Sequence, residues 1–179
     1  RRPARIVEVG SGHSTRFMAE AIADANLSTR LLAIDPEPRA DIRATGATAI
    51  RQTVPGSGLA PFAELGAGDM LFIDSSHVLM PGSDVDFLLN QVLPRLPPGC
   101  LVHIHDMFLP DDYPPAWNWR GYNEQLAVAT LIAGGRWRVL FASHYVATRL
   151  ADAVAASAAG TFPLAAGAFE SSLWLERVS

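Results

Sequence analysis

The sequence predicts an α/β fold in which a mostly parallel sheet carries helices on both faces. Short apolar runs of four to six residues recur along the chain and alternate with helical patterns, which is typical of parallel α/β sheets. The runs are apolar almost throughout, as expected for strands that are covered on both sides. The chain closes with two strands and no clean helix between them, and an antiparallel last strand would explain that break in the rhythm.

Each strand is predicted from one of these apolar runs. The first run, "RIVEV", leads directly into a glycine turn, and "DMLFID" is the most strongly apolar of the set, whereas "ATAIRQ" is the weakest. The predicted strands cover residues 5–9, 30–35, 47–52, 69–74, 99–106, 136–143 and 171–179.

The helices are predicted from the spacing of apolar residues and from glycines that end helices. In residues 14–25, the side chains of Phe17, Met18, Ala21 and Ile22 share one helical face. Further helical segments are predicted at residues 38–46, 58–66, 83–96 and 123–135, the first and last of them ended by glycines.

Two segments do not fit the alternation of strands and helices. Residues 107–121 form a loop rich in proline and aromatic residues, and its prolines are expected to keep it out of helix. We expect this loop to cover the binding site of a substrate. Residues 149–169 form an Ala-rich insertion, and the rest of residues 1–179 is expected to form a single domain.

Composition excludes several classes of protein. The formal net charge of −4 argues against a general attraction to nucleic acid or to anionic membranes. The single cysteine, Cys100, excludes an internal disulfide framework. No run reaches the ~18 apolar residues of a membrane span, so a cytoplasmic protein is expected.

The first strand ends in a loop suited to a nucleoside. Gly10 and Gly12, on either side of Ser11, let the backbone turn sharply and let a ligand approach closely. Asp35 follows Gly12 by 23 residues, the position from which a carboxylate binds the two hydroxyls of a ribose. Glu8 precedes the first glycine by two residues. The loop and the acid together predict a nucleoside-binding crevice.

Charge favours one class of nucleoside. A pyrophosphate would be repelled by Glu8 and by Asp74, which follows the fourth predicted strand, whereas a sulfonium cation would be attracted. The third glycine of the nicotinamide fingerprint is also absent, since Thr15 stands there. The expected cofactor is therefore S-adenosylmethionine (SAM), with Glu8, Gly10, Ser11, Gly12, Asp35 and Asp74 as the residues that bind it.

Several motifs extend this prediction. The segments "VEVGSGHST", "AIDPEP", "LFIDSSHV" and "HIHDMFLP" follow one another in the chain. In that order they resemble the class I SAM-dependent methyltransferases, and more narrowly a branch related to bacterial sugar and macrolide O-methyltransferases. The likeness covers roughly residues 5–146.

The resemblance implies both a fold and roles for residues. The family fold is a three-layer Rossmann-like sandwich with a seven-stranded sheet in the order 3-2-1-4-5-7-6 and an antiparallel strand seven. By resemblance, Glu8, Gly10 and Gly12 border the methionine part of the cofactor, and Asp35 holds its ribose. Residues 1–179 are then expected to form a single methyltransferase domain.

The methyl transfer itself is assigned to the tips of the fourth and fifth strands. There Asp74, His77, His105 and Asp106 are the candidate catalytic residues, because the enzyme must orient a nucleophile and remove its proton. Two mechanisms stay open. Asp74 and Asp106 could bind Mg²⁺ or Mn²⁺, as related sugar O-methyltransferases bind a divalent ion, or His77 or His105 could act as a metal-free general base.

Two other classes of function stay open at this level. One is a metal-dependent hydrolase, which would use the histidines and acids but not the glycine loop. The other is a non-catalytic nucleoside-binding module, which would use the loop and Asp35 alone. For the methyltransferase, the expected partner is a small-molecule acceptor, with a saccharide as candidate, and the candidate assembly is a homodimer.

Overall fold

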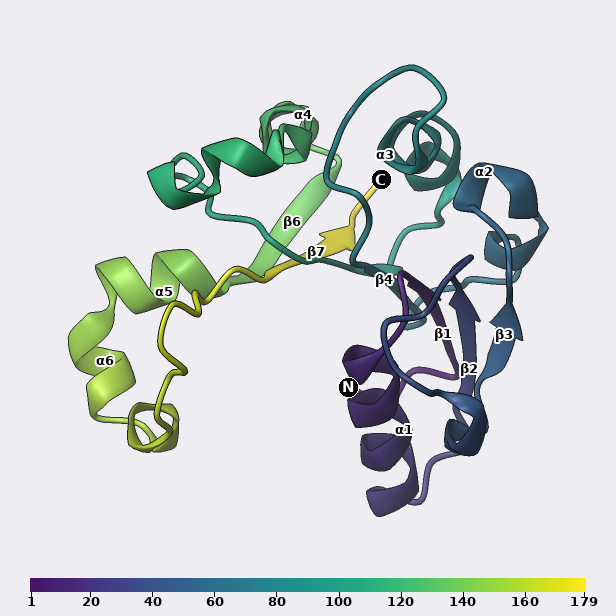
Figure 1. Cartoon of the computed structure of the whole chain (residues 1–179), viewed down its shortest axis with the longest axis horizontal. Coiled ribbons are helices and arrows are strands. Elements are labelled where there is room, and N and C mark those ends of the chain that lie inside the picture. Colours follow the sequence, from purple (N-terminus) through teal and green to yellow (C-terminus); the bar gives the residue numbers. More distant parts are fainter.

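The computed structural model describes residues 1–179 and contains one sheet of seven strands, in the order β3-β2-β1-β4-β5-β7-β6 (Figure 1). Strand β7 runs antiparallel to both of its neighbours, and all other pairs are parallel. The predicted fold class, strand order and antiparallel last strand are therefore confirmed. The strands are β1 (Arg5–Val9), β2 (Arg30–Ile34), β3 (Thr48–Ile50), β4 (Met70–Ile73), β5 (Leu101–Ile104), β6 (Trp137–Ala142) and β7 (Leu173–Arg177).

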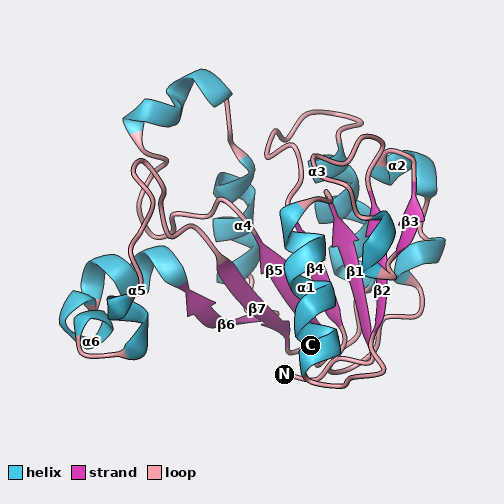
Figure 2. Ribbon diagram, turned by 60° about the horizontal axis from the view of Figure 1, so that its bottom comes forward, coloured by secondary structure: helices cyan, strands magenta, loops and turns pink.

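Helices flank this sheet on both sides. Figures 1 and 2 show α1 on one face and α3 and α4 on the other. Helix α3 continues without interruption into a π-helical stretch, η3, and a 3-10 turn, η4. None of the helices has the length and apolar character needed to span a membrane. The helices are α1 (His13–Asp24), α2 (Val54–Ser57), α3 (Asp84–Phe87), α4 (Glu124–Ala133), α5 (Ser143–Arg149) and α6 (Ala151–Ala155), and the shorter segments include η3 (Leu88–Val92) and η4 (Leu93–Arg95).

Two segments differ from expectation. The helix predicted at 38–46 is only a 3-10 turn, η1 (Arg43–Thr45), because the Asp41 side chain accepts the Arg43 N–H at 2.9 Å and so competes with helix formation. The loop at 107–121 contains a 3-10 helix, η5 (Pro115–Arg120), whose proline stands at the first helical position, where no N–H is needed.

The Ala-rich insertion, residues 149–169, forms α6 and a 3-10 turn, η6 (Ala158–Thr161). It projects away from the sheet, and none of its residues is buried (Figure 1).

The sheet divides the core in two because successive side chains of a strand point to opposite faces. Val7 and Val9 of β1 belong to a cluster of 22 buried residues on the α3 and α4 side. Ile6 belongs to a small cluster of 3 buried residues on the α1 side. Glu8 alternates with Val7 and Val9, so it points toward α1.

Gly10 fixes the approach between the tips of β1 and β4. Its φ is +78°, and a Cβ at this position would lie 2.0 Å from the carbonyl oxygen of Asp74. No side chain fits there, so the glycine is required for the two strand ends to lie side by side.

We expect Gly10→Ala to lower the free energy of unfolding by about 3 kcal/mol or more, because left-handed strain and a backbone clash add together. Gly46→Ala is the matched control: its φ is +73°, but nothing lies within 4 Å of the added Cβ, so about 1 kcal/mol should be lost. Urea denaturation of both variants measures the difference. Equal losses would show that the contact with Asp74 is unimportant.

Candidate active site

A cleft of about 570 Å³ opens at the carboxyl ends of β1, β2 and β4. Its walls include Gly10 and Ser11 from the glycine loop, Asp35 from the end of β2, and Asp74 from the end of β4. This is the edge at which ligands bind in open α/β sheets. The structure thus brings four of the six predicted cofactor-binding residues into one cleft.

Asp35 is tied to the glycine loop. Its Oδ2 accepts the backbone N–H of Ser11 at 2.5 Å and the Ser11 hydroxyl at 3.1 Å, and its Oδ1 accepts the Glu37 N–H at 2.8 Å. These bonds hold the carboxylate at the mouth of β2 and fix the loop against it. The same carboxylate can accept a further hydrogen bond from a hydroxyl in the cleft.

The other two predicted cofactor-binding residues, Glu8 and Gly12, do not line the cleft. Glu8 is fully buried and accepts the hydroxyls of Ser14 and Thr15, each at 2.6 Å, at the start of α1. Burial raises the pKa of Glu8 to about 7, although the two hydroxyl bonds lower it. In this structure Glu8 anchors the first turn of α1, where it shapes the loop from behind.

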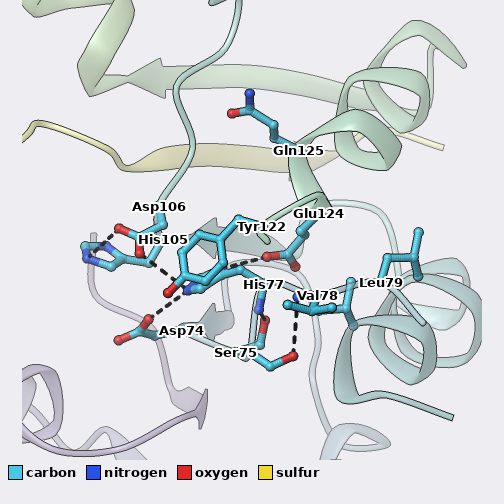
Figure 3. A network of polar contacts seen from close by, with 12 residues as sticks. Asp74, Ser75, His77, Val78, Leu79, His105, Asp106, Tyr122, Glu124 and Gln125 are labelled. Carbon is cyan, nitrogen blue, oxygen red and sulfur yellow. Dashed lines mark hydrogen bonds and ion pairs between the residues drawn. The ribbon is translucent and has the colours of Figure 1, made fainter. Parts of the chain in front are cut away.

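The network centred on His77 joins three elements of the fold (Figure 3). The Nδ1 of His77 lies 2.9 Å from Glu124 at the start of α4, and its Nε2 lies 3.3 Å from Asp74 and 3.7 Å from Asp106. The His77 side chain is 2% exposed and that of Glu124 is 1% exposed. One buried imidazole therefore links the tips of β4 and β5 to α4.

These contacts determine the charge of His77. Burial lowers its pKa, but the hydrogen bonds to Asp74 and Glu124 outweigh burial and raise the pKa to about 9. Burial raises the pKa of Asp74, but the hydrogen bond to His77 and the nearby charges of His105, His77 and Arg39 together outweigh burial, so the net pKa is lowered. Burial raises the pKa of Glu124. His77 is thus an imidazolium at neutral pH and has no free site for another proton.

His105 lies in a different environment from His77. Its side chain is 44% exposed, and its Nε2 lies 3.7 Å from Asp106 Oδ1. That same oxygen of Asp106 accepts the Ser171 hydroxyl at 3.1 Å, which fixes the carboxylate. His105 is therefore the accessible part of the network, whereas Asp106 is buried.

Backbone strain coincides with this network. His77 and Asp106 have φ values of +59° and +54°, and both are non-glycine residues at strand tips. Such conformations persist only where the surroundings enforce them, and they concentrate at functional sites. The strain therefore marks the network as more than a packing feature.

The predicted metal ligands do not fit an ion in this arrangement. Asp74 Oδ1 and Asp106 Oδ2 both face His77 Nε2, which stands between them. No group of three or more His, Cys, Asp or Glu side chains in the chain is placed to hold a metal. The arrangement therefore gives no support to a metal site at Asp74 and Asp106.

Comparison with known families agrees with the geometry. Residues 7–107, more than half of the chain, match the family model described as "Methyltransferase domain". The chain belongs to this methyltransferase family. No curated protein matches the sequence.

Solved structures share the fold of this methyltransferase. The plantazolicin methyltransferase BpumL in complex with SAH matches with a TM-score of 0.52 and 16% identity, over 99% of this chain and 77% of that chain. LepI in complex with SAM matches with a TM-score of 0.57 and 14% identity, over 99% of this chain and 43% of that chain. At this level of identity the likeness extends to the fold alone.

The methyltransferase has one site residue, Glu124, that the sequence did not reveal. Glu124 was predicted only as part of a helix, and an acid in a first turn is ordinarily explained by the helix dipole. Arg120 also lies beside this network. Its guanidinium carbon is 4.1 Å from the centre of the Trp117 ring, and its Nη1 is 3.8 Å from Asp106 Oδ2. The stretch "NEQ", residues 123–125, which follows the loop of residues 107–121, was the available signal for Glu124.

We expect the stability of the methyltransferase to fall between about pH 6.5 and pH 9. The folded pKa of His77, about 9, exceeds its ordinary value of 6.5, so the stabilisation is complete below pH 6.5 and is lost as pH rises through 9. The resulting loss in the free energy of unfolding is about 3 kcal/mol at most. Urea denaturation at a series of pH values measures it.

His77→Gln is the control, and its free energy of unfolding should change far less over the same interval. A parallel decline in the variant and in the unmodified protein would assign the pH dependence to another group.

Proposed function

We propose that this chain is a SAM-dependent methyltransferase that methylates a hydroxyl of a small molecule, with a sugar or natural product as acceptor. The observation that carries the proposal is the position of Asp74. Its carboxylate lines the nucleoside cleft and also pairs with His77, which is next to the buried Asp106 and its exposed neighbour His105. A methyl donor in the cleft would thus adjoin groups that can handle a proton.

The charge of the cleft supports a cationic cofactor. Its walls carry the carboxyl groups of Asp35, Glu37, Asp74 and Asp84 against the single guanidinium of Arg39. An acidic cleft attracts a sulfonium cation and repels a pyrophosphate. The solved structures with the same fold that contain SAH or SAM support this choice.

The chemistry assigns different tasks to the two histidines. When bound, SAM supplies an electrophilic methyl group on a positively charged sulfur. His105 is accessible and takes the proton of the acceptor hydroxyl, and Asp106, 3.7 Å away, stabilises the imidazolium that forms. His77 is already protonated and holds Asp74 and Asp106 in place. Its fixed charge keeps the acids from repelling one another.

The two alternative functions have less support. A metal-dependent hydrolase lacks a ligand cluster, and neither it nor a non-catalytic module is favoured by the family match. The saccharide acceptor, the homodimer and the cytoplasmic location stay predictions.

We expect the protein to bind SAM and S-adenosylhomocysteine, and Asp35→Ala to weaken that binding by about 1–3 kcal/mol, because ribose hydroxyls lose their acceptor. Calorimetric titration with SAM, S-adenosylhomocysteine and NAD measures the affinities. Asp41→Ala, an exposed acid outside the cleft, should leave them unchanged. Binding of NAD without affinity for either sulfur nucleoside would contradict the assignment.

We expect His105→Asn to lower kcat/KM by about 10²- to 10⁴-fold, as the loss of a general base does, while SAM affinity stays nearly constant. Methyl-labelled SAM with a panel of sugars and phenols identifies an acceptor, and mass spectrometry with NMR of the product locates the methyl group.

His13 is an exposed histidine at the start of α1, so His13→Asn is the matched control and should retain its rate.

Asp106→Asn should keep its melting temperature and lose most of its activity. If His105→Asn kept its rate while Asp106→Asn lost it, the carboxylate itself would be the base. A methyl group found on nitrogen or carbon would refute O-methylation.

A further inference from the structure

A second group of polar side chains lies at the opposite edge of the sheet from the cleft. Because β7 is antiparallel to β5, its end lies beside the beginning of β5, where Glu176 pairs with Leu101 and Gly99 donates to the Arg177 carbonyl at 2.7 Å. Figure 2 shows the C-terminus at the edge where β1 begins. Arg177 is thus remote from the strand tips that form the active site.

Arg177 lines a groove of about 420 Å³ between α4 and the segment of η3 and η4. Arg136 and Trp137 line the same groove, and Trp137 is the cross-strand partner of Arg177 in the register of β6 and β7. Apolar walls come from Leu89 and Leu131 among others. The groove therefore combines a basic end with an apolar surface.

The basic end lacks counter-charges. Arg177 is only 6% exposed and Trp137 only 5%, yet Arg177 Nε and Trp137 Nε1 have no hydrogen-bond partner. Neither Arg177 nor Arg136 takes part in any of the ion pairs of the protein. The buried donors of Arg177 and Trp137 thus share one groove with the exposed Arg136, and none of these donors is paired with an acceptor.

This arrangement is costly without a ligand. A buried charge that lacks a partner strongly destabilises a protein. Burial and the neighbouring Arg136 both lower the pKa of Arg177, which expresses the same cost. The guanidinium of Arg177 lies 5.2 Å from the centre of the Trp137 ring, so its planar fork of donors is held in a fixed orientation. A planar fork of this kind matches the two oxygens of a carboxylate or phosphate.

We propose that this groove binds a small amphipathic anion, whose carboxylate or phosphate head pairs with Arg177, Arg136 and the Trp137 N–H and whose apolar tail lies along Leu89 and Leu131. The site is separate from the cofactor cleft, and the proposal does not depend on the methyl-transfer reaction. Arg177 supplies the buried half of the head-group site and Arg136 the exposed half.

Calorimetric titration with octanoate, octyl phosphate, octanol and octylamine tests the proposal, with inorganic phosphate as the head group alone. Octanoate or octyl phosphate should bind at least about 10-fold more tightly than octanol, because the charged hydrogen bonds account for the difference. Octylamine should not bind. Preference between the two anions distinguishes a carboxylate ligand from a phosphate ligand. Equal binding of octanol and both anions would overturn the proposal.

Variants test the residues. Arg177→Met keeps the apolar stem and removes the charge, so it should weaken binding of the anion by about 10-fold or more. It should also raise the melting temperature of the ligand-free protein, since an unpaired buried charge is removed. Arg95→Met, an arginine bonded to the Gln91 carbonyl outside the groove, is the matched control and should change neither quantity.

If Arg177→Met does not fold, as judged by circular dichroism, Trp137→Phe removes the indole N–H while it keeps an aromatic ring. That variant should weaken binding several-fold. Undiminished binding in the folded variants would refute the site.

Discussion

Three carboxylates converge on the imidazole of His77, and the carboxyl edge of the sheet depends on that one ring. Asp74, Asp106 and Glu124 come from the end of β4, the end of β5 and the start of α4, and they would repel one another without a cation between them. A pKa of about 9 keeps the ring charged at neutral pH. The backbone has positive φ at His77 itself and at its partner Asp106.

The two histidines at this edge illustrate how environment assigns roles to identical side chains. His77 is enclosed and saturated with carboxylate partners, whereas His105 is 44% exposed and has one carboxylate beside it. A base that works near neutral pH needs access and an unoccupied nitrogen, which the first lacks and the second has. Motifs in the sequence could not separate the two histidines, because each lies within three residues of an aspartate.

The sheet and the cleft could be predicted because local rules determine them. Apolar runs such as "RIVEV" mark buried strands, and parallel strands bring their carboxyl ends to one edge, so Asp35 and Asp74 were expected to meet. Glu8 was expected near the ligand, but the alternation of β1 directs its side chain toward α1 and into contact with Ser14 and Thr15. Glu124 was missed because its contact with His77 spans 47 residues, and no periodic pattern records a pairing at that distance.

The attachment of α4 has a consequence for how this fold can diversify. Asp106 pairs with the ring of His77, and the N–H groups of Asn123 and Glu124 donate to the His77 carbonyl at 3.0 Å and 3.2 Å. Both ends of the intervening loop are therefore fastened to one residue. Lengthening a loop whose ends are fixed adds only a small entropic cost. Residues between these anchors can thus be inserted, deleted or exchanged in evolution while the groups around His77 keep their places.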